Sequence, residues 1–106
     1  MDPVRVIAEP HRRDMLELIW NREMAAGEIA EQFDLTFGAV SQHLAVLREA
    51  GFVTVRRVGN HRLYRADKRH LGPLRGVLEA MWSETLGDLA ATIESGADKQ
   101  KRRRRQ

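Results

Sequence analysis

Apolar side chains recur at helical spacing near the start of the chain, on both sides of a proline. Val4, Ile7 and Ala8 keep this spacing before Pro10. A broad apolar face follows the proline and is formed by Met15, Leu16, Leu18, Ile19 and Trp20. Proline suits the first turn of a helix, because the N–H that it lacks would have no partner there. Residues 3–22 are therefore predicted to form two short helices that meet at Pro10.

Two further helices are predicted before the pattern changes. Residues 24–34 place apolar side chains at i, i+3, i+4 and i+7, the spacing of one helix face. These side chains are Ala26, Ile29, Ala30 and Phe33. After a tight turn, Thr36 can cap a fourth helix that runs to about Ala50, and Gly51 provides its C-terminal stop. The inward positions of that helix are Val40, Leu44 and Leu47.

The period of the pattern then changes to that of a β-hairpin and back to that of a helix. Strand-forming residues within 52–66 flank Gly59 and Asn60, which suit a hairpin turn. From residue 71 to about residue 95, apolar side chains recur at alternating spacings of three and four, which predicts one long helix. The sequence thus predicts a mainly α fold with a small β-hairpin, in the order four helices, two strands and one helix.

Length and composition are those of one small globular protein. The chain has 106 residues, of which 42% are hydrophobic and 31% charged. Residues 1–95 are predicted to form a single domain, and residues 96–106 a disordered basic tail without apolar periodicity. There is no cysteine, no run of about 20 apolar residues that would span a membrane and no signal-peptide pattern at the N-terminus. We therefore expect a cytoplasmic protein.

The net charge of +3 is distributed unevenly. Residues 1–96 hold 12 basic and 14 acidic side chains, whereas residues 97–106 hold six basic side chains and one acidic. Within the body, residues 56–69 contain six Lys or Arg against Asp67 alone. A protein that presents one face to phosphate has such a basic stretch, although a solvated charged hairpin explains the same charge. The tail could attract phosphate non-specifically, remain a solvated end or recruit an acidic partner.

The order of these elements is that of a winged helix-turn-helix, in which a helix, a short turn and a second helix precede a basic hairpin. The DNA major groove admits one α-helix, whose N-terminal residues touch the base edges. On the helix that follows Thr36, the inward set leaves Gly38, Ser41, Gln42 and Ala45 facing outward. Ser41 and Gln42 can hydrogen-bond bases or phosphates, and the positive end of the helix dipole favours a nearby phosphate.

Three segments resemble, in order and spacing, the ArsR (arsenical-repressor) family of regulators. LTFGAVSQHLAVLREAGFV (residues 35–53) resembles the family's DNA-reading pattern VS-x-HL-x-x-L-x-x-AG-L/F-V. AEPHRRDMLELI (residues 8–19) resembles its ADPTRR-x-IL-x-L segment, and RRVGNHRLYRAD (residues 56–67) resembles its RREGR-x-x-YRL wing. The match covers residues 4–89. It implies a repressor that binds double-stranded operator DNA on the nucleoid, blocks polymerase and often controls its own gene.

The outward positions and the resemblance together give the candidate DNA-binding residues. On the reading helix they are Thr36, Phe37, Gly38, Ser41, Gln42 and His43. On the wing they are Arg56, Arg57, Asn60, His61, Arg62 and Tyr64. Phe37 departs from the family, many members of which carry a polar residue there, so a thymine methyl contact or a different operator is implied. His43 flanks the buried side of its helix and is expected to touch backbone phosphate rather than a base.

The resemblance also implies a homodimer in which the first and last helices pack across a two-fold axis, on a pseudo-palindromic operator. The apolar stripe of the last helix is wider than one thin domain needs, which favours the same conclusion, although a core stripe within one chain is the alternative. The predicted interface residues are Val4, Ile7, Leu74, Leu78, Met81, Trp82, Thr85 and Leu89.

No metal site, cofactor or catalytic residue is predicted. The ligands that the resemblance implies for metal-sensing members are a Cys-x-Cys pair before the turn, or an Asp-x-His with a His-x-x-Glu set on the last helix, and neither is present. The four histidines, at positions 11, 43, 61 and 70, fall on four different elements. Catalysis is not expected, because Ser41 and His43 lie two apart on one helix and so point to different faces.

Two other functions fit the same sequence. One is a dimeric winged-helix module that binds protein rather than DNA, against which the basic cluster of residues 56–69 argues. The other is a derepressor that responds to a small ligand or a metal, for which the sequence identifies no effector.

Overall fold

The computed structural model describes the backbone of residues 1–93 and the side chains of residues 1–83. The described residues divide into two parts, of which the first ends at Arg75 and the second begins at Gly76. The first part contains helices α1 to α5 and all three described strands, and α6 passes from it into the second. The predicted tail and the predicted end of the last helix beyond residue 93 lie outside the described residues.

The first two helices confirm the prediction of a break at Pro10. α1 spans Pro3–Ala8 and α2 spans Pro10–Leu18. Each begins with a proline, and each is capped by the carboxylate of the residue before it, Asp2 or Glu9. The acceptor at the N-cap satisfies a backbone N–H that the helix itself leaves without a partner.

The third helix is shorter than predicted. The local pattern predicts helix throughout residues 24–34, but α3 spans only Ala26–Ala30, and Met24–Ala25 forms strand β1. Met24 pairs with Tyr64 and Ala25 with Leu63 of β3, so hydrogen bonding to a distant strand overrides the local helical pattern. The hairpin predicted from sequence is therefore part of a three-stranded antiparallel sheet in the order β1-β3-β2.

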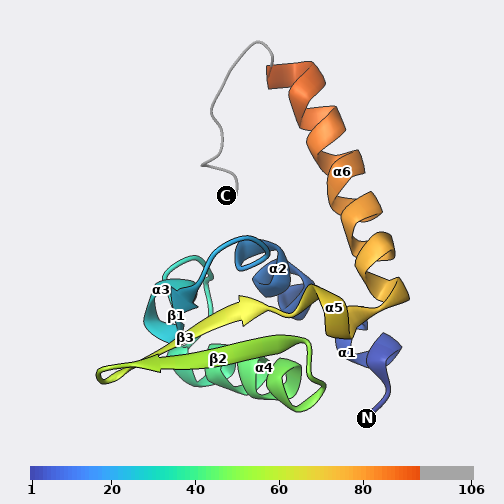
Figure 1. Cartoon of the computed structure of the whole chain (residues 1–106). Helices are drawn as coiled ribbons and strands as arrows, with labels where there is room; N and C mark the ends of the chain where they lie inside the picture. Colours follow the sequence, from blue (N-terminus) through green and yellow to red (C-terminus); the bar gives the residue numbers. More distant parts are fainter. Residues whose placement is uncertain (94–106) are drawn as a thin grey trace. The chain divides into compact units, whose positions relative to one another are not determined.

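The hairpin itself agrees with the sequence. β2 spans Val53–Val58 and β3 spans His61–Ala66, and the two strands pair from Val53 with Ala66 to Val58 with His61. Gly59 has a φ of +62°, the left-handed conformation that a tight hairpin turn requires. Figure 1 shows the hairpin projecting past the neighbouring helices at this turn.

The long predicted helix begins later than residue 71 and follows a separate short helix. α5 spans Lys68–Leu71, and α6 spans Pro73–Ile93. Gly72 between them has a φ of +58° and breaks the helical path, which Pro73 then restarts at a first-turn position. No helix in the described part of the chain is long and apolar enough to cross a membrane.

The hydrophobic core lies between the helices of the first part and the base of the sheet. α2 and α4 are in contact, as are α3 and α4 (Figure 1). The side chains that are fully shielded from solvent in this part are Met15, Leu16, Ile19, Ile29, Val40, Leu44 and Leu47. These include all three inward positions predicted for the fourth helix and three of the five predicted for the second, in which Trp20 is also buried and Leu18 is half-buried. Burial of this set fixes the orientation of α4, and so decides which of its side chains face outward.

Candidate nucleic-acid interface

Helix α4, Phe37–Glu49, starts and ends where the sequence predicts. Oγ1 of Thr36 accepts a hydrogen bond from the backbone N–H of Ala39 at 3.0 Å, which is the expected N-cap. At the other end Gly51 has a φ of +82°, a conformation that side chains with a Cβ rarely adopt. The two ends of the helix are thus set by local signals, and the burial of its inward side chains sets its orientation.

The outward face of α4 carries the residues that are predicted to read DNA. Phe37 is 57% exposed, Gly38, Gln42 and Ala45 are also exposed, and Ser41 is half-buried. The first turn of a helix also presents backbone N–H groups without partners, which favour an anion. The N-terminal half of α4 therefore offers a hydroxyl, an amide and an aromatic ring on a surface with little side-chain bulk beside them.

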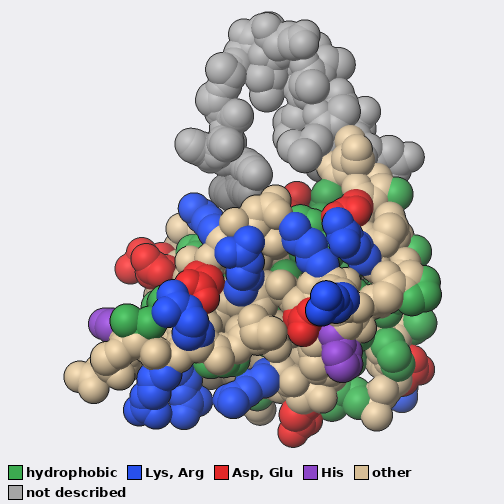
Figure 2. Space-filling model, viewed as in Figure 1, with side chains coloured by type: hydrophobic (Ala, Val, Ile, Leu, Met, Phe, Trp, Pro, Cys, Tyr) green, Lys and Arg blue, Asp and Glu red, His purple; other side chains and the backbone are tan. Residues whose placement is uncertain are grey.

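Two arginines face each other across the wing. Arg57 of β2 pairs in register with Arg62 of β3, and both are exposed. Like charges directly opposite each other on neighbouring strands are destabilising by themselves. Neither arginine forms an ion pair within the described residues. A bound anion would offset this repulsion, and Figure 2 shows basic side chains gathered over the hairpin.

A shallow groove joins the reading helix to the wing. We call it the wing groove, and it is lined by Ala25, Ala26, Gly27, Phe37, Ser41, Asn60, His61, Arg62 and Tyr64. Six of these nine residues belong to the predicted DNA-binding set, and the fold brings them together from α4 and the hairpin. The other three, at the start of α3, were missed because nothing in the local pattern indicated that β1 would pair with β3.

Arg56 differs from the other wing arginines because it is already paired. Its Nε and Nη2 donate to the carboxylate of Glu23 at 2.9 Å and 2.7 Å. These hydrogen bonds lower the pKa of Glu23, so the pair is ionised at neutral pH. Lys68, also in the basic cluster, donates to Oδ1 of Asn21 and lies 5.4 Å from the ring centre of Trp20. Two of the positive charges in the basic cluster of residues 56–69 therefore already contact other side chains of the same chain.

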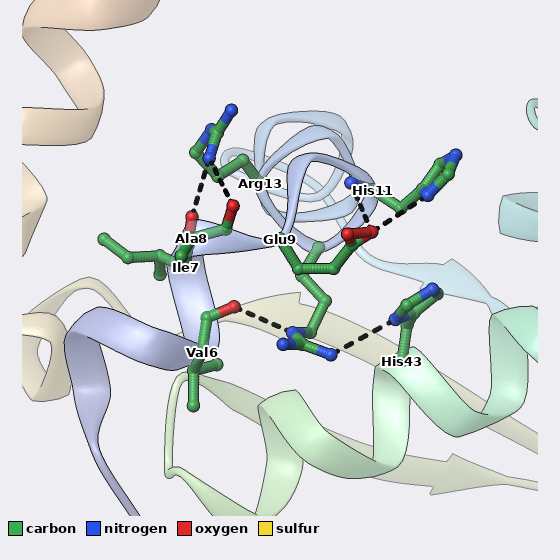
Figure 3. A network of polar contacts seen from close by, with 8 residues as sticks. Val6, Ile7, Ala8, Glu9, His11, Arg13 and His43 are labelled. Atoms are coloured by element: carbon green, nitrogen blue, oxygen red, sulfur yellow. Dashed lines mark hydrogen bonds and ion pairs between the residues drawn. The ribbon is translucent and has the colours of Figure 1, made fainter.

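His43 lies on the side of α4 that faces the start of α2 (Figure 3). It is half-buried, and its Nδ1 is 3.4 Å from Nη1 of Arg12. Burial lowers the pKa of His43, and the positive charge of Arg12 lowers it further. Contact with phosphate remains a prediction for this residue, but its ring is held by protein groups in the free chain.

Two of the four histidines lie close together beside a carboxylate, although the sequence predicts no set of metal-ligating side chains. The ring centres of His11 and His43 are 5.7 Å apart, and Glu9 adds a carboxylate within 4.8 Å of both rings' nitrogens. His11 and His43 do belong to different elements, as predicted, but α2 and α4 pack together and bring them side by side. Sequence periodicity shows which face of each helix is buried, and it does not show which polar residues meet at the edge of that contact.

The predicted dimer residues fall into three groups. Val4 and Met81 are 62% and 40% exposed, and Leu74 and Trp82 are half-buried. The side chains of Thr85 and Leu89 lie outside the described set. Ile7 and Leu78 are buried in the single chain, at 8% and 0% exposure. α6 also exposes Val77, at 51%, four residues before Met81 and on the same helix face.

Comparison with known proteins decides the family. Residues 9–55 match the family described as "Bacterial regulatory protein, arsR family". The HTH-type transcriptional regulator Rv2034 of Mycobacterium tuberculosis is 35% identical over 94 residues, which cover 89% of this chain and 88% of that protein. The chain belongs to the arsR family. The resemblance drawn from the three sequence segments is thereby confirmed.

Other relatives of this arsR-family chain agree with the fold and the function. The transcriptional repressor SdpR of Bacillus subtilis is 35% identical over 60 residues, covering 57% of this chain and 67% of that protein. The crystal structure of a possible transcriptional regulator for arsenical resistance is similar with a TM-score of 0.67 and 37% identity, covering 93% of this chain and 99% of that one. The chain is a winged-helix, DNA-binding transcriptional regulator.

Proposed function

We propose that this arsR-family protein is a homodimeric repressor whose α4 enters the major groove while its hairpin lies on the adjoining DNA backbone. The observation that carries the proposal is the wing groove, in which Ser41 of α4 and Arg62 of β3 line the same surface. A helix and a wing that share one surface can contact bases and phosphates of the same DNA segment. Neither element would need to move to complete that surface.

The two kinds of contact have different roles in this proposal. Ser41 and Gln42 lie on the first turns of α4 and carry the hydrogen-bonding groups that distinguish bases. Arg57 and Arg62 supply positive charge for the phosphates, which fixes position and affinity without reading the sequence. Phe37 is exposed at the start of the helix, where it would contact a thymine methyl group.

The dimer is supported by the apolar side chains that each part of the chain leaves exposed. α1 exposes Val4, and α6 exposes Val77 and Met81 on one face. Large exposed apolar side chains on one helix face, such as those of Val77 and Met81, are typical of protein contacts rather than of solvated surface. A two-fold dimer would present two α4 helices to two half-sites of an operator.

Repression would follow from the binding of the dimer to promoter DNA alone. A dimer bound over a promoter covers the DNA that polymerase needs, so no further domain is required. The Bacillus subtilis relative is named a transcriptional repressor, which favours this direction of control. We further propose that the gene for the protein itself is among its targets.

Fluorescence-anisotropy titration tests this function. The full chain is titrated against the DNA upstream of its own gene and against a shuffled duplex of equal length and composition, at several salt concentrations. We expect a preference of about 10³ or more for the upstream DNA. Equal, steeply salt-dependent binding to both would contradict autoregulation. No binding to either at low salt would exclude DNA as the partner and favour a protein-interaction module.

A further inference from the structure

Glu9, His11 and His43 form a cluster that lies outside the wing groove. Each offers one nitrogen or oxygen atom, and these three atoms all lie within 4.8 Å of one another. All three side chains are half-buried, so they are shielded on one side and open to solvent on the other. Glu9 and His11 come from the start of α2, and His43 comes from the middle of α4 (Figure 3).

The fold fixes the backbone positions of these three residues. Glu9 is the N-cap of α2, and its Oε2 accepts from the backbone N–H of His11 and lies 3.0 Å from Nδ1 of the same residue. His43 precedes Leu44, which is fully buried in the contact of α4 with the core. The two helices are thus fixed relative to each other, and only side-chain rotations separate the three ligand atoms from a common centre.

The donor set suits a transition-metal ion. Two imidazole nitrogens and one carboxylate oxygen are ligands of Zn²⁺, at about 2.0–2.2 Å each. Ligand atoms around a tetrahedral ion at that distance are about 3.4 Å apart, so the most widely separated pair, which lies within 4.8 Å, must close by about 1.4 Å at most. The contact of Glu9 with His11 is already closer than this. Three protein ligands leave a fourth position for water.

We propose that Glu9, His11 and His43 bind one Zn²⁺ or a similar divalent ion, linking the start of α2 to the reading helix. This site differs from the ligand positions that the family resemblance implied, which lie before the turn and on the last helix. Metal binding here is a property of the free protein and does not require DNA. Its test is therefore independent of the proposed repressor function.

Arg12 competes with the metal for His43. Its Nη1 lies 3.4 Å from Nδ1 of His43, a weak hydrogen bond that uses the one lone pair of a neutral imidazole, so neither ring nitrogen can bind a metal while this contact is made. Its Nε also donates to the carbonyl of Val6 at 2.7 Å, and because the guanidinium is planar and rigid the whole group must move to release His43. The metal thus replaces a contact of Arg12 with the reading helix, and removal of the guanidinium should tighten metal binding.

The experiment uses the untagged full chain, because a histidine tag would itself bind metal. Zn²⁺ affinity is measured by competition with a chromophoric chelator, and Co²⁺ is added separately to record the visible absorption of the site. We expect one ion per chain and the intense bands of a four-coordinate cobalt site. Glu9→Gln, His11→Gln and His43→Gln should each weaken Zn²⁺ binding at least about tenfold, about 1.4 kcal/mol. Arg12→Met should strengthen it.

His61→Gln is the matched control, because His61 is an exposed histidine on the wing and forms no such cluster with other described residues. It should bind Zn²⁺ as the unmodified chain does. Circular dichroism verifies that each variant is folded, and His11→Gln, at a half-exposed position, keeps the test valid if His43→Gln does not fold. Zn²⁺ binding that is equal in His11→Gln and the unmodified chain, or absent from both, overturns the site. Weaker binding by folded Arg12→Met overturns it as well.

Discussion

Arg56 of β2 donates two hydrogen bonds to Glu23, a residue that precedes β1 and lies 33 positions earlier in the sequence. The pair joins the hairpin to the segment that leads into β1. Both side chains are partly exposed, so the pair contributes little to stability. Its larger effect is electrostatic, since it neutralises one positive charge on the surface that is proposed to meet DNA.

Removing that carboxylate should strengthen DNA binding without improving its specificity. In Glu23→Gln the guanidinium of Arg56 becomes available to a phosphate, so affinity should rise similarly for operator and random duplexes. The slope of log affinity against log salt should steepen by up to about 0.9, the effect of one additional neutralised phosphate. Glu49→Gln removes the same formal charge from the end of α4 and serves as the control. An equal change in both variants would show that only net charge matters.

The pairing of Arg56 with Glu23 shows where prediction from the sequence ends. Hydrophobic periodicity identifies α1, α2, α4 and the hairpin, because each depends on neighbours a few positions away. The N-cap at Thr36 and the positive φ at Gly59 are equally local. These signals are enough to predict the fold class and most of the residues that line the wing groove.

Features that depend on contacts between distant elements are not predictable in this way. Met24 and Ala25 have no strand signal of their own and become β1 only because β3 offers an edge for pairing. His11 and His43 meet because Met15 and Leu16 of α2 and Leu44 of α4 are buried in the core. Hydrophobic periodicity predicts the burial of these residues, but it does not predict the distance between the polar residues beside them. For the same reason the sequence predicts that Arg56 binds DNA, whereas in the structure its guanidinium is paired with Glu23.

The reading helix and the wing should respond differently to substitution. Combining Ser41→Ala with Gln42→Ala should cost about 1–3 kcal/mol for each base that the helix no longer reads, and it should reduce affinity for the operator alone. Combining Arg57→Gln with Arg62→Gln should weaken operator and random duplexes alike and make the salt slope shallower by about 0.9 for each phosphate involved. Anisotropy titration of both duplexes at several salt concentrations separates the two effects. The assignment of α4 as the reading helix is wrong if the first double variant keeps full preference for the operator.

The cap of the reading helix should contribute measurably to stability. In Thr36→Ala the backbone N–H of Ala39 loses its acceptor at 3.0 Å, so the free energy of unfolding should fall by about 1 kcal/mol. Thr36→Ser retains the hydroxyl and should stay close to the unmodified chain. Urea denaturation followed by circular dichroism measures both. A Thr36→Ser variant as unstable as Thr36→Ala would mean that the methyl group, rather than the hydroxyl, stabilises the start of α4.

Gly51→Ala should destabilise the fold through its backbone rather than through a clash. The φ of +82° at Gly51 disfavours any residue with a Cβ by about 1–2 kcal/mol. The new Cβ would also lie 2.6 Å from Nε2 of His70, but that ring is exposed and can turn aside. The double variant with His70→Ala should therefore recover little of the stability in the same denaturation assay. Full recovery would instead identify the imidazole as the cause.

The exposed face of α6 should control dimer formation. Val77→Glu places a charge on a surface that is proposed to be buried between two chains, and an unpaired charge in such an interface is strongly unfavourable. The dimer dissociation constant, measured by sedimentation equilibrium, should rise at least about tenfold, about 1.4 kcal/mol. Ser83→Glu adds the same charge to an exposed position on a different face of the helix and should leave the dimer intact. Operator affinity should fall with dimer stability in Val77→Glu, because a monomer contacts only one half-site. A monomeric unmodified chain that still prefers its operator would remove the need for the two-fold interface altogether.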